Sequence, residues 1–397
     1  LRQLDLTDVP AIVEHFATES VDAIAIVLIN SYANPDHEER LEAELRRCGF
    51  DGDVSLSYRV SGEYREYERT TTTVIDAFVR HRMGPYLRRL RDGLSERGFQ
   101  GELLITRSGG GALTVEEALQ RPFETILSGP AATLVGAAFL TGSNDAIVSD
   151  IGGTTTDIAV MKNGTPRLDP LGARVGGFQT MVQAVAMRTI GLGGDSEVRL
   201  VEEGLSIKLE LGPRRAMPIS LLAMDHRDTV HQALDRQLRA EIPRPTDARF
   251  VVPMPVTSAA QAGLSPAESA LLAKIGDEPH AVDKVAETRT ELGALTRLVT
   301  NGLIMISALT PSDAAHVLEI HEIWDREAAQ MAAELVARRR GGKGEILFET
   351  KEDVAHAIIK KLVRSSAEAL IDVALDEDGF KLDRPSLHPL IIASLDK

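Results

Sequence analysis

The sequence predicts an α/β protein with mixed sheets flanked by helices and a mostly helical C-terminal part. Three observations lead to this prediction. Short apolar runs alternate with amphipathic patterns along residues 1–140, as strands and helices do in α/β proteins. From residue 146 the apolar runs follow one another closely, with Gly-rich turns typical of antiparallel strands. Beyond residue 266 the pattern is helical almost throughout.

The N-terminal part is expected to begin with a buried strand between two helices. Residues 22–30 are rich in Ile, Val and Ala without alternation, which is typical of a strand covered on both faces. A helix is expected to break near Gly84-Pro85, because proline lacks the N–H that a helix uses. Strands are expected at 22–30, 54–60 and 103–106, and helices at 9–19, 35–48, 65–97 and 128–140.

The second half is expected to pass from strands to helices. The Pro-rich stretch 239–266 is interpreted as a connection between the two. Strands are expected at 146–150, 156–162, 165–169, 181–187 and 207–211, with a further strand-like run at 389–395. Helices are expected at 287–298, 302–308, 312–340 and 351–375.

Composition excludes several classes of function. The 397 residues carry 44 basic and 59 acidic side chains, a net charge of −15 that repels nucleic acid and anionic membranes. The aliphatic run 23–29 is far shorter than the roughly 20 residues that cross a bilayer. Cys48 is the only cysteine, which rules out an internal disulfide or a cysteine-based zinc site and suits a reducing cytoplasm. Since the chain starts at Leu1 without a leader, we expect a fragment of a longer polypeptide.

The segment 150–157, Asp-Ile-Gly-Gly-Thr-Thr-Thr-Asp, lies between two expected strands and therefore forms a hairpin tip. Gly152 and Gly153 would let an anion approach backbone N–H groups without meeting a Cβ. A phosphate requires several such donors at once. Three hydroxyl groups add to the set, those of Thr154, Thr155 and Thr156. The alternative is an ordinary Gly-Gly hairpin with a polar tip.

Two carboxylates bracket this tip, Asp150 before it and Asp157 after it. Carboxylates repel phosphate, so beside a phosphate loop they are expected to hold Mg²⁺ or to orient an attacking water. Asp150 and Asp157 are therefore the candidate catalytic and metal-holding residues.

At these residues the sequence resembles the hydantoinase A/5-oxoprolinase family of the superfamily of acetate and sugar kinases, heat-shock chaperones and actin (ASKHA). The string 150–157 is similar to the family's second phosphate motif. Five further stretches agree in the same order along roughly residues 1–320: 63–70, 108–111, 126–132, 190–196 and 309–316.

The sequence also departs from the family pattern. The first phosphate motif has no counterpart and is expected upstream of Leu1. Asp195 stands where the family has a glycine, and 211–215 replaces a Pro-Gly-Pro segment. These differences suggest a divergent branch.

The resemblance implies the two-lobed ASKHA fold, in which actin-like, ribonuclease-H-like lobes enclose a nucleotide. Residues 1–140 would then hold the end of the N-terminal lobe and the interdomain helices. Residues 141–240 would form the phosphate-loop lobe, and residues 241–397 the mainly helical part of the second lobe.

The resemblance also implies an ATP- and Mg²⁺-dependent hydrolase that opens a cyclic amide of the hydantoin or 5-oxoproline type. Phosphorylation of the amide oxygen would remove the resonance that protects the carbonyl. Asp150 would lie nearest the Mg²⁺-bound or attacking water, with Asp157 supporting it. A hydantoinase B-like subunit is a candidate partner. The alternatives are an ATP-using carboxylase subunit and a non-catalytic nucleotide-sensing or assembly subunit.

Weaker candidates lie elsewhere in the chain. Gly193 and Gly194 would let a nucleotide come close or would simply turn a strand. His316 and His321 are five residues apart, which does not suit the i, i+4 pair of a helical zinc site. A substrate role and a purely structural role are both open for Ser108, Gly109, Gly110 and Arg69.

Overall fold

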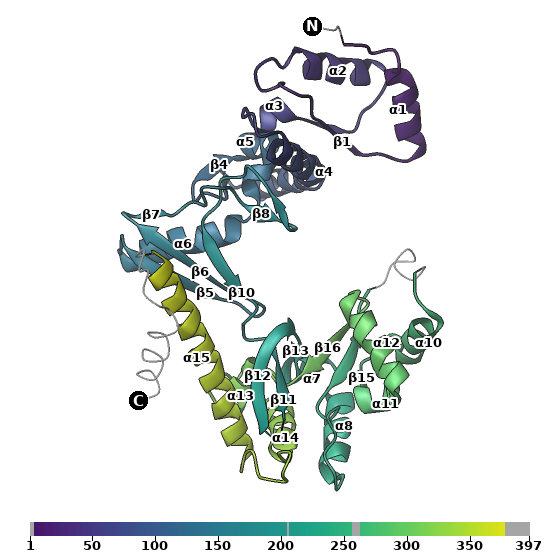
Figure 1. Ribbon diagram of the computed structural model, residues 1–397, viewed down its shortest axis with the longest axis vertical. Coiled ribbons are helices and arrows are strands. Elements are labelled where there is room, and N and C mark those ends of the chain that lie inside the picture. The colour runs from purple at the N-terminus through teal and green to yellow at the C-terminus, as the bar shows by residue number, and fades with distance from the viewer. Residues whose placement is uncertain (1–3, 205, 256–262, 378–397) are drawn as a thin grey trace. The chain divides into compact units, whose positions relative to one another are not determined.

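The computed structural model describes residues 4–204, 206–255 and 263–377 (Figure 1). The chain divides into two compact units, each described here by itself. Unit 1 comprises residues 1–150 and 158–188, and unit 2 comprises residues 151–157 and 189–397. The expected mixed α/β character is confirmed. Within the described ranges, no helix is both long and apolar enough to cross a bilayer.

Unit 1 begins with two parallel strands, β1 (Ala23–Ile26) and β2 (Asp53–Leu56), joined through helix α2 (Asp36–Arg47). Helix α1 (Val9–Thr18) contributes to the same small apolar core. The expected strand 54–60 ends early, because residues 57–60 form the short helix α3 (Ser57–Val60). Buried Glu38 explains the change, since its carboxylate accepts hydrogen bonds from the Ser57 hydroxyl and the Tyr58 N–H at the start of α3.

Helix α4 (Glu66–Glu96) is continuous, so the expected break near Gly84-Pro85 is wrong. Gly84 has no Cβ to clash with the proline ring, which removes the usual restriction on the residue before proline. The missing N–H of Pro85 then costs only one helical hydrogen bond.

The rest of unit 1 consists of short strands and helices. The expected strand 181–187 is wrong, because only Met187 lies in a strand. The segment pairs only irregularly with residues 167–173, through single backbone hydrogen bonds and an isolated bridge between Leu168 and Val185, while Val182 and Ala184 are buried in a cluster with Phe123. The sheet order is β10-β6-β5, with β7 paired to β6. The strands are β3 (Leu104–Thr106), β4 (Ala112–Thr114), β5 (Ala146–Ile151), β6 (Thr156–Lys162), β7 (Thr165–Pro166), β8 (Arg174–Val175), β9 (Phe178–Gln179) and β10 (Met187–Ile190). The helices are α5 (Val115–Gln120), the 3-10 helix η1 (Pro122–Thr125) and α6 (Ser128–Thr141).

Unit 2 contains an antiparallel hairpin, β11 (Ser196–Glu203) with β12 (Ser206–Arg215), and a mixed sheet. The mixed sheet has the order β13-β16-β14-β15, with β13 parallel to β16 and β14 antiparallel to both of its neighbours. Its strands are β13 (Met217–Pro218), β14 (Phe250–Pro253), β15 (His280–Ala281) and β16 (Ile304–Ala308). The helices are α7 (Ile219–Asp225), α8 (Arg227–Arg239), α10 (Pro266–Ile275), α11 (Val282–Val285), α12 (Arg289–Thr300), α13 (Pro311–Val317), α14 (Arg326–Ala337) and α15 (Lys351–Glu377).

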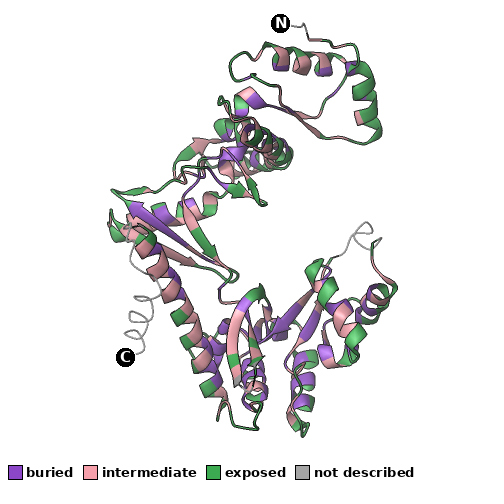
Figure 2. Cartoon of the chain, in the orientation of Figure 1, coloured by how far each residue is buried: buried purple, intermediate pink, exposed green. Residues whose placement is uncertain are grey.

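Three expectations in unit 2 are wrong. Within the expected helix 302–308, residues 304–308 form the inner strand β16, and the supposed connection 239–266 contains β14. Both strands are largely buried, as Figure 2 shows, so tertiary pairing outweighs their weak local signals. The expected helix 312–340 is two helices, because Glu319 adopts a left-handed conformation with φ 59° just after α13. The predicted run 389–395 lies outside the described residues.

Candidate functional site

The loop between β5 and β6, Gly152–Thr155, is a short exposed tip that we call the phosphate-type loop. It is closed by a hydrogen bond from the Gly152 N–H to the Thr155 carbonyl at 2.9 Å. Gly152, Gly153 and Thr154 are exposed, whereas Thr156 at the start of β6 is fully buried. The loop therefore presents its backbone to solvent while its base is anchored.

The polar groups of this loop are largely unused. Among the described residues, the N–H groups of Gly153, Thr154 and Thr155 find no hydrogen-bond acceptor. The hydroxyls of Thr154 and Thr155 likewise make no hydrogen bond to any residue that the structure describes. Three amide donors and two hydroxyls on three consecutive residues form a set that an anion with several acceptor oxygens can satisfy.

A second Gly-rich segment supports the loop from within unit 2. The N–H of Gly194 donates to the Gly152 carbonyl at 3.0 Å, and the N–H of Asp195 donates to the Gly153 carbonyl at 2.7 Å. A Cβ on Gly193 would lie 2.5 Å from both of these carbonyl oxygens. Glycine at position 193 is therefore required by the close approach of two backbone segments.

The supporting segment is itself held by the start of α13. The backbone N–H of Ser312 donates to the Gly194 carbonyl at 2.8 Å, and its hydroxyl donates to the same oxygen at 2.9 Å. Buried Asp313 fixes this corner by accepting hydrogen bonds from Thr310 and from the N-terminus of α7 at Ser220. Desolvation raises the pKa of the Asp313 carboxyl above its ordinary value, against the effect of these donors.

The residues that bracket the loop are engaged in different ways. Thr156 donates its hydroxyl to the Leu192 carbonyl at 2.7 Å, so this hydroxyl anchors the loop. Asp157 accepts a hydrogen bond from the Thr189 hydroxyl at 2.5 Å. Asp150, the last residue of unit 1 before the chain enters the loop, accepts a hydrogen bond from Thr133 of α6 at 2.8 Å. In each of the two Asp side chains, the second carboxylate oxygen makes no hydrogen bond to a residue that the structure describes, and the metal-holding role stays a prediction.

The weaker substrate candidates lie in unit 1, mostly with their polar groups in use. Ser108 is buried, and both its N–H and its hydroxyl donate to the Glu124 carbonyl. Gly110 lies at φ 89° in the turn between β3 and β4, next to half-buried Gly109. Arg69 is fully buried, and its guanidinium donates to the Leu28 carbonyl, Ser31 and Glu66. Their substrate role remains a prediction.

His316 has a structural environment. One ring nitrogen lies 2.7 Å from the Ser312 carbonyl, and the other accepts from the Trp324 N–H at 3.2 Å. The His316 ring stacks on His321 and on Trp324, with 5.2 Å between ring centroids in each pair. Both nitrogens of His316 are therefore engaged in packing the start of α14 against α13.

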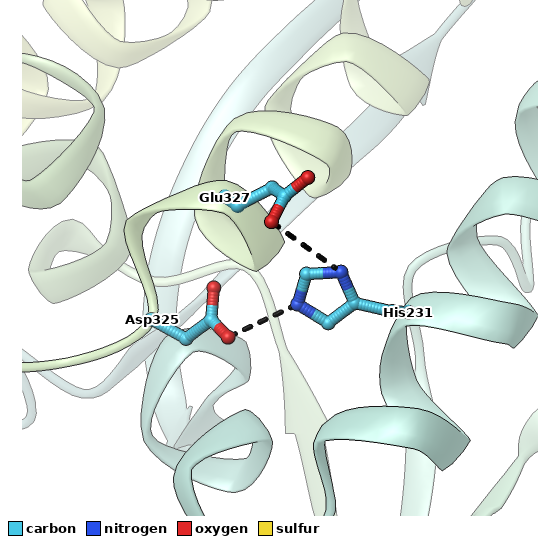
Figure 3. Close-up of side chains that lie close together, drawn as sticks. All are labelled: His231, Asp325 and Glu327. Carbon is cyan, nitrogen blue, oxygen red and sulfur yellow. Dashed lines mark hydrogen bonds and ion pairs between the residues drawn. The ribbon is translucent and has the colours of Figure 1, made fainter.

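Among the described residues, His231 of α8 forms a charged cluster with Asp325 and Glu327 at the start of α14 that the sequence did not suggest (Figure 3). The two ring nitrogens of His231 lie 3.0 Å from Asp325 and 3.9 Å from Glu327. These are residue types that bind metals, but Arg227 already pairs with both carboxylates. The guanidinium is the resident cation, so the cluster is best described as a link between α8 and α14.

The chain belongs to the hydantoinase/oxoprolinase family. The family described as "Hydantoinase/oxoprolinase" matches residues 69–383, and "Hydantoinase/oxoprolinase N-terminal region" matches residues 1–49. These matches confirm the family inferred from residues 150–157.

Two curated relatives are informative. The chain is 33% identical over 222 residues to caprolactamase subunit alpha of Pseudomonas jessenii, and 30% identical over 226 residues to the acetophenone carboxylase gamma subunit of Aromatoleum aromaticum. Each match covers 54% of this chain and 30% of the relative. The chain therefore matches less than a third of the length of these relatives.

The fold is similar to that of a solved enzyme structure. A nucleotide-free structure of acetone carboxylase, described as ATP-dependent, matches with a TM-score of 0.55 over 94% of this chain and 42% of that chain. The sequence identity is 18%, so this likeness concerns the fold alone.

Proposed function

We propose that this chain forms the phosphate-binding part of an ATP-dependent enzyme that opens a small cyclic amide. The observation that carries the proposal is the exposed phosphate-type loop. Its three consecutive residues Gly153, Thr154 and Thr155 have backbone N–H groups without an acceptor among the described residues. Unused backbone donors at a Gly-rich tip are what a triphosphate needs, because its charge must be met by several donors at once. In this proposal the chain has the ASKHA architecture.

The residues around the loop have distinct roles in this proposal. Gly193 and Gly194 hold the loop backbone in place, so that its donors are preorganised before nucleotide arrives. Asp150 orients an attacking water or accepts its proton, and Asp157 keeps the base of the hairpin fixed through Thr189. The carboxylates of Asp150 and Asp157 are oxygen donors of the type that Mg²⁺ prefers, and Mg²⁺ would supply charge neutralisation for the phosphates.

The substrate class rests on the relatives. Caprolactamase and 5-oxoprolinase are named for cyclic amides, and both resemble this chain. A lactam resists water because amide resonance weakens its carbonyl as an electrophile, and transfer of phosphate to the amide oxygen removes that resonance. A carboxylase subunit is the second candidate, supported by the acetophenone carboxylase relative. Several of these relatives are named as subunits, so a partner subunit belongs to the proposal.

Phosphate release from ATP tests the proposal. The protein, with any partner subunit present, is assayed with Mg-ATP alone, with caprolactam or 5-oxoproline, and with a ketone plus bicarbonate. We expect the lactam to stimulate phosphate release at least about tenfold, because correct substrate binding completes the site. Stimulation by ketone and bicarbonate alone would favour the carboxylase, and ATP binding without any stimulated turnover would favour a nucleotide-sensing subunit.

A further inference from the structure

A carboxylate lies directly against the phosphate-type loop. A Cβ placed on Gly153 would lie 2.6 Å from Oδ2 of Asp195 and 3.0 Å from its Cγ. The Asp195 side chain therefore occupies the space that the side chain of any other residue at position 153 would enter. The Asp195 backbone is also tied to the loop, because its N–H donates to the Gly153 carbonyl at 2.7 Å.

Arg215, at the end of β12, holds the Asp195 carboxylate in this place. Its Nε and Nη2 donate to the same Oδ2, at 3.2 and 3.1 Å. The residue after Arg215, Ala216, donates its N–H to the Asp195 carbonyl at 2.8 Å. The two segments are therefore joined through their backbones as well as through this ion pair. The Asp195 side chain is 14% exposed and that of Arg215 is 53% exposed. The carboxylate is thus mostly enclosed, while its counter-ion faces solvent.

This arrangement gives the loop two opposing electrostatic properties. The free N–H groups of residues 153–155 attract an anion, whereas the Asp195 carboxylate beside Gly153 repels it. Because the loop has only four residues, a phosphate on it lies well within the screening length of about 8–10 Å at ordinary salt. A free polyphosphate anion would feel the part of this repulsion that the Arg215 guanidinium does not offset. A polyphosphate that carries a divalent cation would feel it much less, since the cation offsets the charge.

We propose that Asp195, held by Arg215, makes the phosphate-type loop discriminate between polyphosphate complexed with a divalent cation and the free anion, in favour of the complex. Asp195 is then a specificity-determining residue. This inference rests on the proposed function, because it requires that the loop binds phosphate. The competing explanation is an ion pair that only stabilises the hairpin, as exposed pairs do weakly.

The test is a calorimetric titration of the protein with ATP, once with excess Mg²⁺ and once with a chelator. The measured quantity is the ratio of the two dissociation constants, metal-free over Mg-bound. The test variant is Asp195→Asn, which keeps the shape and removes the charge. Asp195→Gly is the second variant if the first does not fold. The matched control is Asp225→Asn, an exposed carboxylate of the same unit with no hydrogen bond or ion pair to the described residues.

We expect the parent protein to prefer Mg-ATP and Asp195→Asn to reduce the ratio at least about tenfold, mainly through tighter binding of metal-free ATP. Arg215→Gln should increase the ratio several-fold, because it leaves the carboxylate unpaired. Asp225→Asn should leave the ratio within about twofold of the parent.

Two results would overturn the inference, and they have different consequences for the proposed function. If the parent binds Mg-ATP but Asp195→Asn leaves the ratio unchanged, Asp195 does not set the selectivity and the proposed function stands. If neither the parent nor Asp195→Asn binds ATP in either condition, the loop is not a phosphate site, and the proposed function fails together with this inference.

Discussion

Two Gly-rich turns of the molecule look alike in sequence but differ in how they use their polar groups. In the Ser108–Gly111 turn of unit 1, Ser108 is buried and spends both its N–H and its hydroxyl on the Glu124 carbonyl. In the Gly152–Thr155 loop of unit 2, three consecutive N–H groups have no acceptor among the described residues. The two turns therefore differ in that only Gly152–Thr155 presents three free N–H groups in succession among the described residues, which is the feature that the proposed phosphate role requires.

The largest expected effect is on ATP turnover, after replacement of Asp150, the carboxylate that precedes the loop. Asp150→Asn should lower ATP turnover at least about 100-fold, the scale of losing a positioned base. The fold should persist, because the amide oxygen can still accept the Thr133 hydrogen bond. Steady-state phosphate release measures the effect, and Asp145→Asn, in the turn just before the same strand, is the control. Turnover within a few-fold of the parent would remove Asp150 from the mechanism.

A branched side chain in the Gly152–Thr155 loop should weaken the binding of ATP. Gly153→Val is expected to weaken ATP binding at least about tenfold, because its Cβ would lie 2.6 Å from the Asp195 carboxylate and displace one of the two segments. Gly62→Val is the control, since a Cβ there would meet no atom within 4 Å. Undiminished affinity in a folded Gly153→Val protein would show that phosphate does not bind this loop.

The sequence was informative about the Gly152–Thr155 loop, because that loop leaves a local pattern. The Gly-Gly-Thr-Thr-Thr string predicts both the hairpin tip and its unused donors, because glycine spacing and hydroxyl content are local properties. The support behind the loop could not be predicted in the same way. Gly193 and Asp195 contact residues about 40 positions earlier, and Arg215 reaches Asp195 only because β12 pairs with β11.

The errors in the fold have the same origin. Residues 302–308 contain Met and Ala, which tolerate helices, yet residues 304–308 form β16 because Phe250 and Val251 of β14 pair with Ser307 and Ile306. Pro253 suggested a connection, but it is the last residue of β14, so its missing N–H falls at the end of the strand rather than within it. Pro85 suggested a break in α4 that the preceding glycine prevents.

A change in the Ser108–Gly111 turn should affect the stability of the protein rather than its binding of ATP. Ser108→Ala removes a buried hydroxyl that donates to the Glu124 carbonyl, and it should lower the free energy of unfolding by about 1 kcal/mol. Ser143→Ala removes an exposed hydroxyl that donates to the Asp145 carbonyl, and we expect a change of less than about 0.5 kcal/mol. Urea denaturation measures both. Equal effects at the two positions would mean that the Ser108 hydrogen bond contributes no special stability.

The smallest expected effect concerns the N-terminus of α12, where Thr288 and Glu291 form a capping box. The N–H of Thr288, its hydroxyl and the N–H of Glu287 donate to Glu291 and lower the pKa of its carboxyl from 4.5 to about 2. Because the folded pKa is the lower one, the stabilisation is present above pH 4.5 and is lost as the pH falls toward 2. The parent should therefore be more stable than Glu291→Gln at pH 7, and the difference should shrink below pH 4.5. A constant difference in Tm across this range, with Glu287→Gln as control, would contradict the capping role.

The most direct test of the central claim follows the backbone amides of both turns during a titration with Mg-ATP. In amide-resolved NMR spectra of the protein, the account predicts saturable shifts for Gly153, Thr154 and Thr155, because their N–H groups acquire phosphate acceptors. It predicts no comparable shift for Ser108, whose N–H already donates to Glu124. Saturable binding of Mg-ATP that leaves the three loop amides unshifted would contradict the account.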